Sequence, residues 1–170
     1  MVDALDLGSS ALRHGGSSPF SRTIHTIFMT LTSLIIVVAP EVQDAVEIDR
    51  IQRTCILRAV RQLKRLGIRV GRVIALDTPE ARYIASALRK KNIVRGKPVI
   101  VSQCTRELLT DEAIPDRVAV VVGAEDARSL MRAYLENDFL PVIDPLTTIE
   151  LSIDGSLARL RCVIPVAIQP

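Results

Sequence analysis

Residues 33–40 read Ser-Leu-Ile-Ile-Val-Val-Ala-Pro, and this stretch decides the fold. Every residue from Leu34 to Val38 is apolar, most of them are β-branched, and the run stops at Pro40. A short apolar run of this composition is typical of a strand that is buried on both faces. Such strands belong to sheets that carry helices on both sides, so the stretch predicts an α/β protein.

The segment before this strand has a different composition. Because it is rich in glycine and serine, we expect residues 1–28 to be a flexible leader and residues 29–170 to form one domain. The apolar run at 27–39 is too short to cross a bilayer as a helix, so no membrane is expected as a partner. A signal peptide is the alternative, since Arg13 and Arg22 precede the run, but its β-branched residues favour a strand.

Strands and helices alternate along the rest of the chain. Gly67 suits the C-cap of a first long helix, whereas Thr78 and Pro79 suit the N-cap and first turn of a second. The apolar positions of the first helix, which step by three or four residues, are Ile48, Ile51, Cys55, Ala59 and Leu63. The predicted elements are strands at 33–39, 72–76, 99–102, 118–122 and 140–143, helices at 43–66, 78–91, 105–109 and 124–137, and a hairpin at 148–163.

This order of elements predicts a three-layer sandwich. A mainly parallel sheet would be covered by helices on both faces, as in flavodoxin-like and Rossmann-like proteins. The alternating runs around Asp154-Gly155 are a strong hairpin signal, so the hairpin at 148–163 would add an antiparallel edge or a subunit contact.

Composition excludes several classes of function. Both histidines, His14 and His25, lie in the leader, so histidine-dependent catalysis and a metal site are not expected in the domain. The three cysteines are widely spaced, which argues against a disulfide scaffold or a zinc site and favours a reducing cytoplasm. Aromatic residues make up only 3%, so base-stacking platforms are not expected. No glycine-rich dinucleotide or P-loop motif follows a strand, and we expect no cofactor.

Charge is divided unevenly along the chain. Residues 50–106 contain 15 basic and 2 acidic residues, whereas residues 107–170 contain 5 basic and 11 acidic ones. Arginine dominates the basic residues, which suits bidentate contact with phosphate or carboxylate and is also common in heat-stable proteins. Such asymmetry predicts an anionic partner or an oppositely charged subunit.

The long basic helix is the first candidate binding surface. Like charges four residues apart destabilise a helix, so a run without acidic residues predicts something that compensates it. Two compensators are consistent with the pattern: RNA, tRNA for example, and the acidic surface of another subunit in a homo-oligomer or hetero-oligomer. The candidate anion-binding residues are Arg50, Arg53, Arg58, Arg61, Lys64 and Arg65.

The carboxyl ends of the strands are the second candidate site, because ligands of open α/β sheets bind there. Cys104 follows the third strand and precedes a short helix, where its thiol pKa could be lowered, with Arg106 stabilising the thiolate. The alternative is that Cys104 is a small buried residue. The acidic residues after Gly123 would repel phosphate and suit helix capping. The candidate pocket residues are Asp77, Thr78, Ser102, Gln103 and Gly123.

These residues give the chain a resemblance to a known family. The strand at 34–38, the helix that ends in Arg61-Gln-Leu-Lys-Arg-Leu-Gly67, the cysteine in Val99-Ile-Val-Ser-Gln-Cys104 and the run Val118–Gly123 together resemble the DsrE/DsrF-like sulfur-relay family. The resemblance implies an oligomeric three-layer α/β subunit that carries sulfur as a persulfide on Cys104. It would make the protein a cytoplasmic sulfur carrier.

A second resemblance covers residues 117–163. The strand, the helix and the closing hairpin look like the C-terminal domain of archaeal tRNA-splicing endonuclease subunits. Because no histidine follows His25, this likeness implies a non-catalytic RNA-binding or assembly subunit of a tRNA-processing complex that uses the basic helix. The sequence thus supports both a catalytic and a binding role.

Overall fold

The structure is a computed structural model, and it describes residues 31–41, 48–109, 115–135, 140–154 and 157–166. The predicted leader, residues 1–28, lies outside the described residues. Within these ranges, no helix is both long enough and apolar enough to span a membrane.

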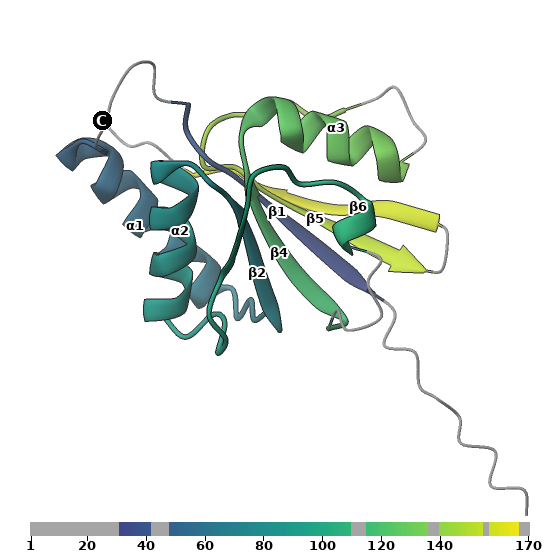
Figure 1. Cartoon of the computed structure of the whole chain (residues 1–170), viewed down its shortest axis with the longest axis horizontal. Coiled ribbons are helices and arrows are strands. Elements are labelled where there is room, and N and C mark those ends of the chain that lie inside the picture. Colours follow the sequence, from purple (N-terminus) through teal and green to yellow (C-terminus); the bar gives the residue numbers. More distant parts are fainter. Residues whose placement is uncertain (1–30, 42–47, 110–114, 136–139, 155–156, 167–170) are drawn as a thin grey trace, which may run out of the picture.

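The described strands form one mixed sheet of six strands in the order β3-β2-β4-β1-β5-β6 (Figure 1). Strands β3, β2, β4 and β1 are parallel to one another, whereas β5 and β6 are antiparallel to their neighbours. The prediction of a mainly parallel sheet is therefore only partly right, because the terminal hairpin extends the sheet beyond β1. The strands are β1 (Ser33–Val38), β2 (Arg72–Leu76), β3 (Val99–Val101), β4 (Arg117–Val122), β5 (Thr148–Asp154) and β6 (Leu157–Ile164).

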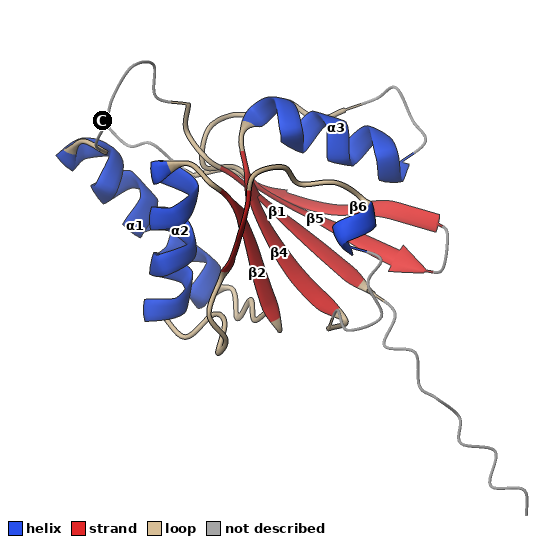
Figure 2. Cartoon of the chain, in the orientation of Figure 1, coloured by secondary structure: helices blue, strands red, loops and turns tan. Residues whose placement is uncertain are grey.

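Helices cover both faces of this sheet, so the predicted three-layer α/β architecture is confirmed. Helices α1 (Arg50–Arg65) and α2 (Pro79–Lys90) lie together on one side, and α3 (Ala124–Leu135) lies on the other (Figure 2). A single 3-10 turn at Glu107–Leu109 replaces the predicted short helix. Strand β1 is buried along its whole length between β4 and β5, as its composition predicts.

The ends of the helices follow from local sequence. The Asp49 side chain accepts a hydrogen bond from the Gln52 amide at 2.7 Å, and the Gln52 side chain accepts one from the Asp49 amide at 3.2 Å. This reciprocal pair is a capping box, and it begins α1. Gly67 follows α1 with a φ of 71°, a conformation that glycine adopts without steric cost. The Thr78 hydroxyl accepts from the Ala81 amide at 3.3 Å and begins α2, as predicted.

The buried stripe of α1 differs from the predicted one. Ile56, Ala59, Val60 and Leu63 face the core, whereas Ile51 is 75% exposed and Cys55 is half-buried. A step of four residues turns about 40° further than one full helical turn, so a run at 51, 55, 59 and 63 rotates away from the sheet. Of the predicted stripe, Ala59 and Leu63 therefore reach the core, together with Ile48, which precedes the helix.

The predicted strand at 140–143 does not exist, and the chain there has no regular structure. Pro141 and Pro145 lack amide hydrogens, so this segment cannot make a continuous ladder of hydrogen bonds. The chain rejoins the sheet where the Leu146 amide donates to the Val38 carbonyl at 2.8 Å. The predicted hairpin at 148–163 is confirmed as β5 and β6, although Gly155 lies outside the described residues.

Candidate functional site

A cleft lies beyond the carboxyl ends of three parallel strands. Because β1, β2 and β4 run in the same direction, their ends at Val38, Leu76 and Val122 meet at one edge of the sheet. The cleft has a volume of about 470 Å³. Its lining residues are Ala39, Pro40, Glu41, Leu76, Thr78, Glu80, Gly123, Glu125 and Asp126.

The cleft is acidic. Its lining contains the four carboxylates of Glu41, Glu80, Glu125 and Asp126 and no arginine, lysine or histidine. A Cβ atom placed on Gly123 would lie 3.8 Å from Oδ2 of Asp126 and 4.0 Å from Oε1 of Glu41. These two carboxylates therefore converge on the open space above Gly123.

Glu80 is the most unusual of these residues, since it is only 6% exposed. No hydrogen bond or ion pair joins its carboxylate to another described residue. Most of the side chain is buried, but the carboxylate oxygens are not among the fully buried unpaired atoms of the described residues, so they face the solvent of the cleft. The cleft thus contains an anionic group that lacks a partner within the part of the chain that the structure describes.

Helix geometry explains how the carboxylates are tolerated together. Glu80 lies in the first turn of α2, and Glu125 and Asp126 lie in the first turn of α3. Negative side chains are stabilised near a helix N-terminus by the exposed amides and the helix dipole. Both helices begin at the same edge of the sheet, and they bring these acids to one cleft.

The acids do not form a compact metal site. The described residues contain no group of three or more histidine, cysteine, aspartate or glutamate side chains that could hold a metal ion. Carboxylates spread along a cleft suit a larger cation, whose charge and hydrogen-bond donors are distributed over several atoms.

The structure separates the predicted pocket residues into two groups. Thr78 and Gly123 line the cleft. Asp77 is exposed and forms an ion pair with Arg82, while Ser102 and Gln103 are exposed and lie outside the cleft lining. Asp77 therefore has a structural role close to its own position in the sequence, since its partner Arg82 lies in the helix α2 that follows directly.

Cys104 does not have the surroundings of a reactive thiol. It is buried, and burial followed by the charge of Asp126 raises the pKa of its thiol to about 11. Arg106 points to α3 instead: its Nη1 donates to the Ala133 carbonyl at 3.0 Å, and its guanidinium carbon lies 5.0 Å from the Tyr134 ring centroid. The thiol therefore stays protonated near neutral pH, and Arg106 stabilises the loop against α3.

The candidate anion-binding residues of α1 are all exposed. Arg53 donates from Nε to the Ile48 carbonyl at 3.0 Å. Three arginines line a shallow hollow of about 320 Å³ with Gln62 and Val166; they are Arg58, Arg61 and Arg65. The side chains of Arg50, Arg53, Arg58, Arg61, Lys64 and Arg65 form no ion pair with a described acidic residue.

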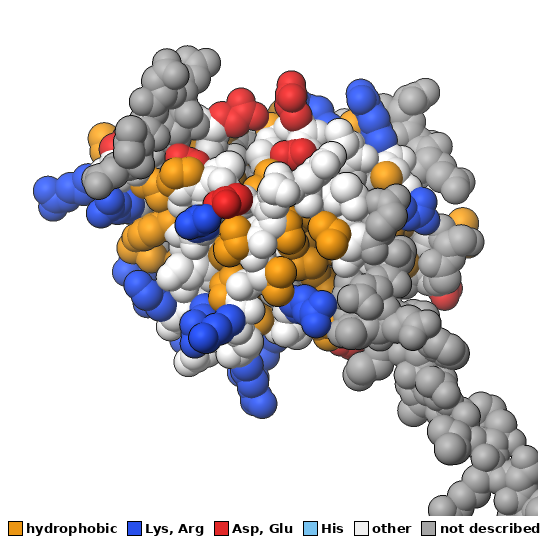
Figure 3. Space-filling view, in the orientation of Figure 1, with side chains coloured by type: hydrophobic (Ala, Val, Ile, Leu, Met, Phe, Trp, Pro, Cys, Tyr) orange, Lys and Arg blue, Asp and Glu red, His pale blue; other side chains and the backbone are white. Residues whose placement is uncertain are grey.

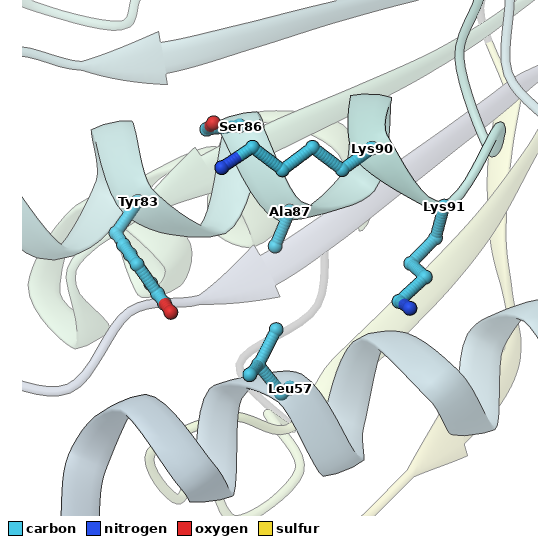
Figure 4. A pocket seen from close by; sticks show the side chains of 6 residues that line it. All are labelled: Leu57, Tyr83, Ser86, Ala87, Lys90 and Lys91. Carbon is cyan, nitrogen blue, oxygen red and sulfur yellow. The ribbon is translucent and has the colours of Figure 1, made fainter. Parts of the chain in front are cut away.

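A smaller groove lies between α1 and α2 (Figure 4). It has a volume of about 260 Å³, and in Figure 4 Leu57 of α1 points toward Ala87 of α2 across it. Tyr83 and Lys91 stand at its two ends, and Lys90 lies along the outer surface of α2. The groove has an apolar floor with basic groups at its rim.

The sequence analysis identified the acids after Gly123 as groups that repel phosphate and cap a helix, but it did not predict that they share one cleft with Glu41 and Glu80. Each is explained locally, because Glu80, Glu125 and Asp126 are ordinary residues for a first helical turn. The sequence did contain one signal: acidic residues occur in the first turn of a helix after β2 and again after β4, and these two strands are parallel and end at the same edge of the sheet. Only the strand order shows that these turns share one cleft with Glu41.

Solved structures with the same fold are phosphatases and mutases. The protein histidine phosphatase SixA complexed with tungstate matches with a TM-score of 0.68 at 11% identity, over 78% of this chain and 96% of that one. Phosphoglycerate mutase from Plasmodium falciparum matches with a TM-score of 0.60 at 13% identity, over 83% and 95%. A mycobacterial glucosyl-3-phosphoglycerate phosphatase matches with a TM-score of 0.58 at 14% identity, over 76% and 97%.

The chain therefore has an α/β fold of the histidine phosphatase and phosphoglycerate mutase type. At these identities the likeness establishes the shared fold and nothing of the chemistry. No family model matches the sequence, and no curated protein matches it.

This fold corrects both resemblances drawn from the sequence. The neighbours are phosphatase-like rather than DsrE/DsrF-like, so the assignment as a sulfur carrier with a persulfide on Cys104 is wrong. The likeness to a tRNA-splicing endonuclease subunit is wrong for the same reason, and with it the role in RNA binding or in a tRNA-processing complex. Both resemblances depended on the alternation of strands and helices, which many α/β folds share.

Proposed function

We propose that this chain is a phosphatase-fold protein that binds a small organic cation in its strand-end cleft and does not hydrolyse phosphate esters. One observation carries the proposal: the cleft is lined by four carboxylates and no basic side chain, and the buried Glu80 has no partner among the described residues. The potential in such a cleft attracts cations and repels phosphate.

Phosphoryl transfer requires the opposite charge. The transferred group carries negative charge in its transition state, which phosphatases and kinases stabilise with arginine, lysine, metal ions or helix N-termini. The related SixA structure holds tungstate, which is an oxyanion. In this chain Glu80, Glu125 and Asp126 occupy the helix N-termini at the edge where an open α/β sheet binds its ligand.

Size and donor chemistry define the class of ligand. A volume of about 470 Å³ is in the range of small-molecule sites. A primary amine or a guanidinium offers several N–H donors, which can reach both the carboxylates above Gly123 and the buried Glu80. The ligand we propose is therefore an alkylamine or alkylguanidine.

Isothermal titration calorimetry with agmatine and spermidine tests this proposal on the full chain. We expect saturable binding that weakens at least about tenfold in Glu80→Gln and in Asp126→Asn. Asp154→Asn removes an exposed carboxylate at the far end of β5 and should bind like wild type. Equal affinity in wild type and both cleft variants would disprove the cation site.

A phosphatase assay tests the second part of the proposal, that the chain does not hydrolyse phosphate esters. We expect no release of nitrophenol from para-nitrophenyl phosphate above the uncatalysed rate, and no calorimetric binding of inorganic phosphate. Hydrolysis that disappears in Glu80→Gln would show that the cleft is a phosphatase site and would overturn the proposal.

We also propose a cytoplasmic location. Cys55, Cys104 and Cys162 are all free thiols, as in most proteins of a reducing compartment. Secretion into an oxidising compartment in the native host, measured by fractionation, would contradict it.

A further inference from the structure

We infer that the cation in the cleft is an arginine from helix α1 of a second copy of this chain, so that the protein associates head to tail. The inference rests on the proposed function, because it names the partner that brings the cation. It joins two surfaces of opposite charge, neither of which is neutralised within the described part of the chain.

The acidic surface is the strand-end cleft with its four carboxylates. Its second distinguishing feature is Glu80, a residue that is more than nine-tenths buried and lines the cleft. Its carboxylate has no hydrogen-bond or ion-pair partner among the described residues, and its oxygens still reach the solvent of the cleft. A guanidinium that enters the cleft would supply that partner, and it would also reach the carboxylates of Glu41 and Asp126 above Gly123.

The basic surface is the arginine hollow, which consists of Arg58, Arg61 and Arg65 of α1 with Gln62 and Val166. These arginines are three and four residues apart, so they lie on one face of the helix along about 10 Å. Their mutual repulsion destabilises α1 unless an anionic surface compensates it. No carboxylate among the described residues does so.

The two surfaces lie on different parts of the molecule. In the view of Figure 3, most acidic side chains lie above, over the loops and the start of α3, and most basic ones lie to the left and below, over α1 and α2. A copy cannot easily bring its own α1 arginines into its own cleft. A second copy in a similar orientation can do so.

Charge complementarity favours a second copy over another partner, because one chain carries both halves of the contact. Arginine forms bidentate pairs with carboxylates and loses less hydration than lysine does. Contacts between unlike surfaces are heterologous, so the assembly closes into a ring or grows as a chain of copies.

Sedimentation velocity of the full chain tests the inference. At about 50 mM salt we expect the average mass to rise with protein concentration above the 18.7 kDa of one chain, and to return to it at about 500 mM salt. Arg61→Glu and Glu125→Arg should each weaken the association by at least about tenfold. The matched controls are Arg159→Glu and Asp154→Arg, which reverse exposed charges on β6 and β5 outside both surfaces and should associate like wild type.

Mixing the two variants gives the sharpest result. Arg61→Glu keeps its cleft and Glu125→Arg keeps its arginine hollow, so the mixture should form a heterodimer although each variant alone is monomeric. A wild type that stays monomeric at low salt, or variants that associate unchanged, would overturn the inference.

The test separates this inference from the proposed function. Arg61→Glu retains the cleft, so as a monomer it should still bind agmatine. If it binds agmatine while wild type never associates, the cation site stands and the second copy is not its ligand. If neither agmatine binding nor association occurs, both proposals fail.

Discussion

Nη2 of Arg117 on β4 lies 3.2 Å from Oε1 of Glu150 on β5, although β1 separates the two strands in the sheet. The same oxygen accepts from Ser33 at 3.0 Å and from Nη1 of Arg161 at 3.1 Å. Glu150 is only 6% exposed, and these three donors, together with the Cys162 thiol that donates to Oε2 at 3.7 Å, compensate the burial of its charge. The carboxylate thus links β4 and β1 of the parallel part of the sheet to the antiparallel hairpin of β5 and β6.

Glu150→Gln should lower the free energy of unfolding by about 2 kcal/mol, because two arginines would lose a buried charged acceptor. The figure is below the usual value for a buried ion pair, since the side chain of Arg161 is 63% exposed. Urea denaturation followed by circular dichroism measures it. Asp154→Asn on the same strand should change stability by less than about 0.5 kcal/mol, and equal effects of the two substitutions would refute the role of Glu150.

Cys104 should react slowly with iodoacetamide in the native protein. With a thiol pKa of about 11 instead of 9.0, its thiolate fraction near pH 8 is about a hundredfold lower than that of an ordinary thiol. Mass spectrometry of the alkylated protein should show a native rate that rises up to about pH 11, and a fast rate after unfolding in urea. Rapid native alkylation at neutral pH would contradict the burial of this thiol.

The same thiol makes stability depend on pH. The folded protein holds the Cys104 proton up to about pH 11, whereas the unfolded chain releases it near pH 9.0. The unfolded state therefore binds fewer protons between these values, and the free energy of unfolding falls as the pH rises through this window. Cys104→Ala should flatten this part of the curve, and an unchanged slope in the variant would assign the effect to other groups.

Two isoleucines on α1 should respond very differently to truncation. Ile56 is fully buried, so Ile56→Ala should cost about 2–5 kcal/mol through lost burial and the cavity that remains. Ile51 is 75% exposed, and Ile51→Ala should change stability by less than about 0.5 kcal/mol. The denaturant midpoints of the two variants measure these losses. A larger loss for Ile51→Ala than for Ile56→Ala would mean that the buried face of α1 is the one predicted from the sequence.

The capping box of α1 should contribute measurably to stability. Asp49→Ala removes the acceptor of the Gln52 amide, so we expect a loss of about 1 kcal/mol. Asp49→Asn keeps an acceptor and should recover most of it. Thermal unfolding of the two variants provides the comparison, and equal melting temperatures for Asp49→Ala and wild type would rule out a role for the cap.

Local signals in the sequence predicted the elements well. Gly67, Thr78 and Pro79 mark helix ends by their own backbone chemistry, and the strand at 34–38 is evident from composition. The wrong prediction of a strand also has a cause in local backbone chemistry. The predicted strand at 140–143 has the right apolar residues, but it lacks the amide of Pro141.

The candidate site could not be predicted in this way, because its charge is a sum over distant residues. Glu41, Glu80 and Asp126 belong to three different segments, and Glu80 and Asp126 each have a local explanation as residues of a first helical turn. Their common cleft depends on strand order, which is a property of the whole chain. For Cys104 the local sequence was misleading: its position after a strand and before a helix predicted a reactive thiol, whereas the structure shows that the thiol is buried.

The position of β4 between β1 and β2 also constrains how the chain is made. In the ladder β1 bonds to β4 and β5, and β2 bonds to β3 and β4, so the first two strands have no direct contact. During synthesis on the ribosome, β1 and β2 cannot pair with β4 until residues 117–122 have left the ribosome, so their backbone N–H and C=O groups on that side stay unpaired until then. Nascent chains paused before that point should be protease-sensitive and should depend on chaperones, because the strand that closes the sheet is still inside the tunnel.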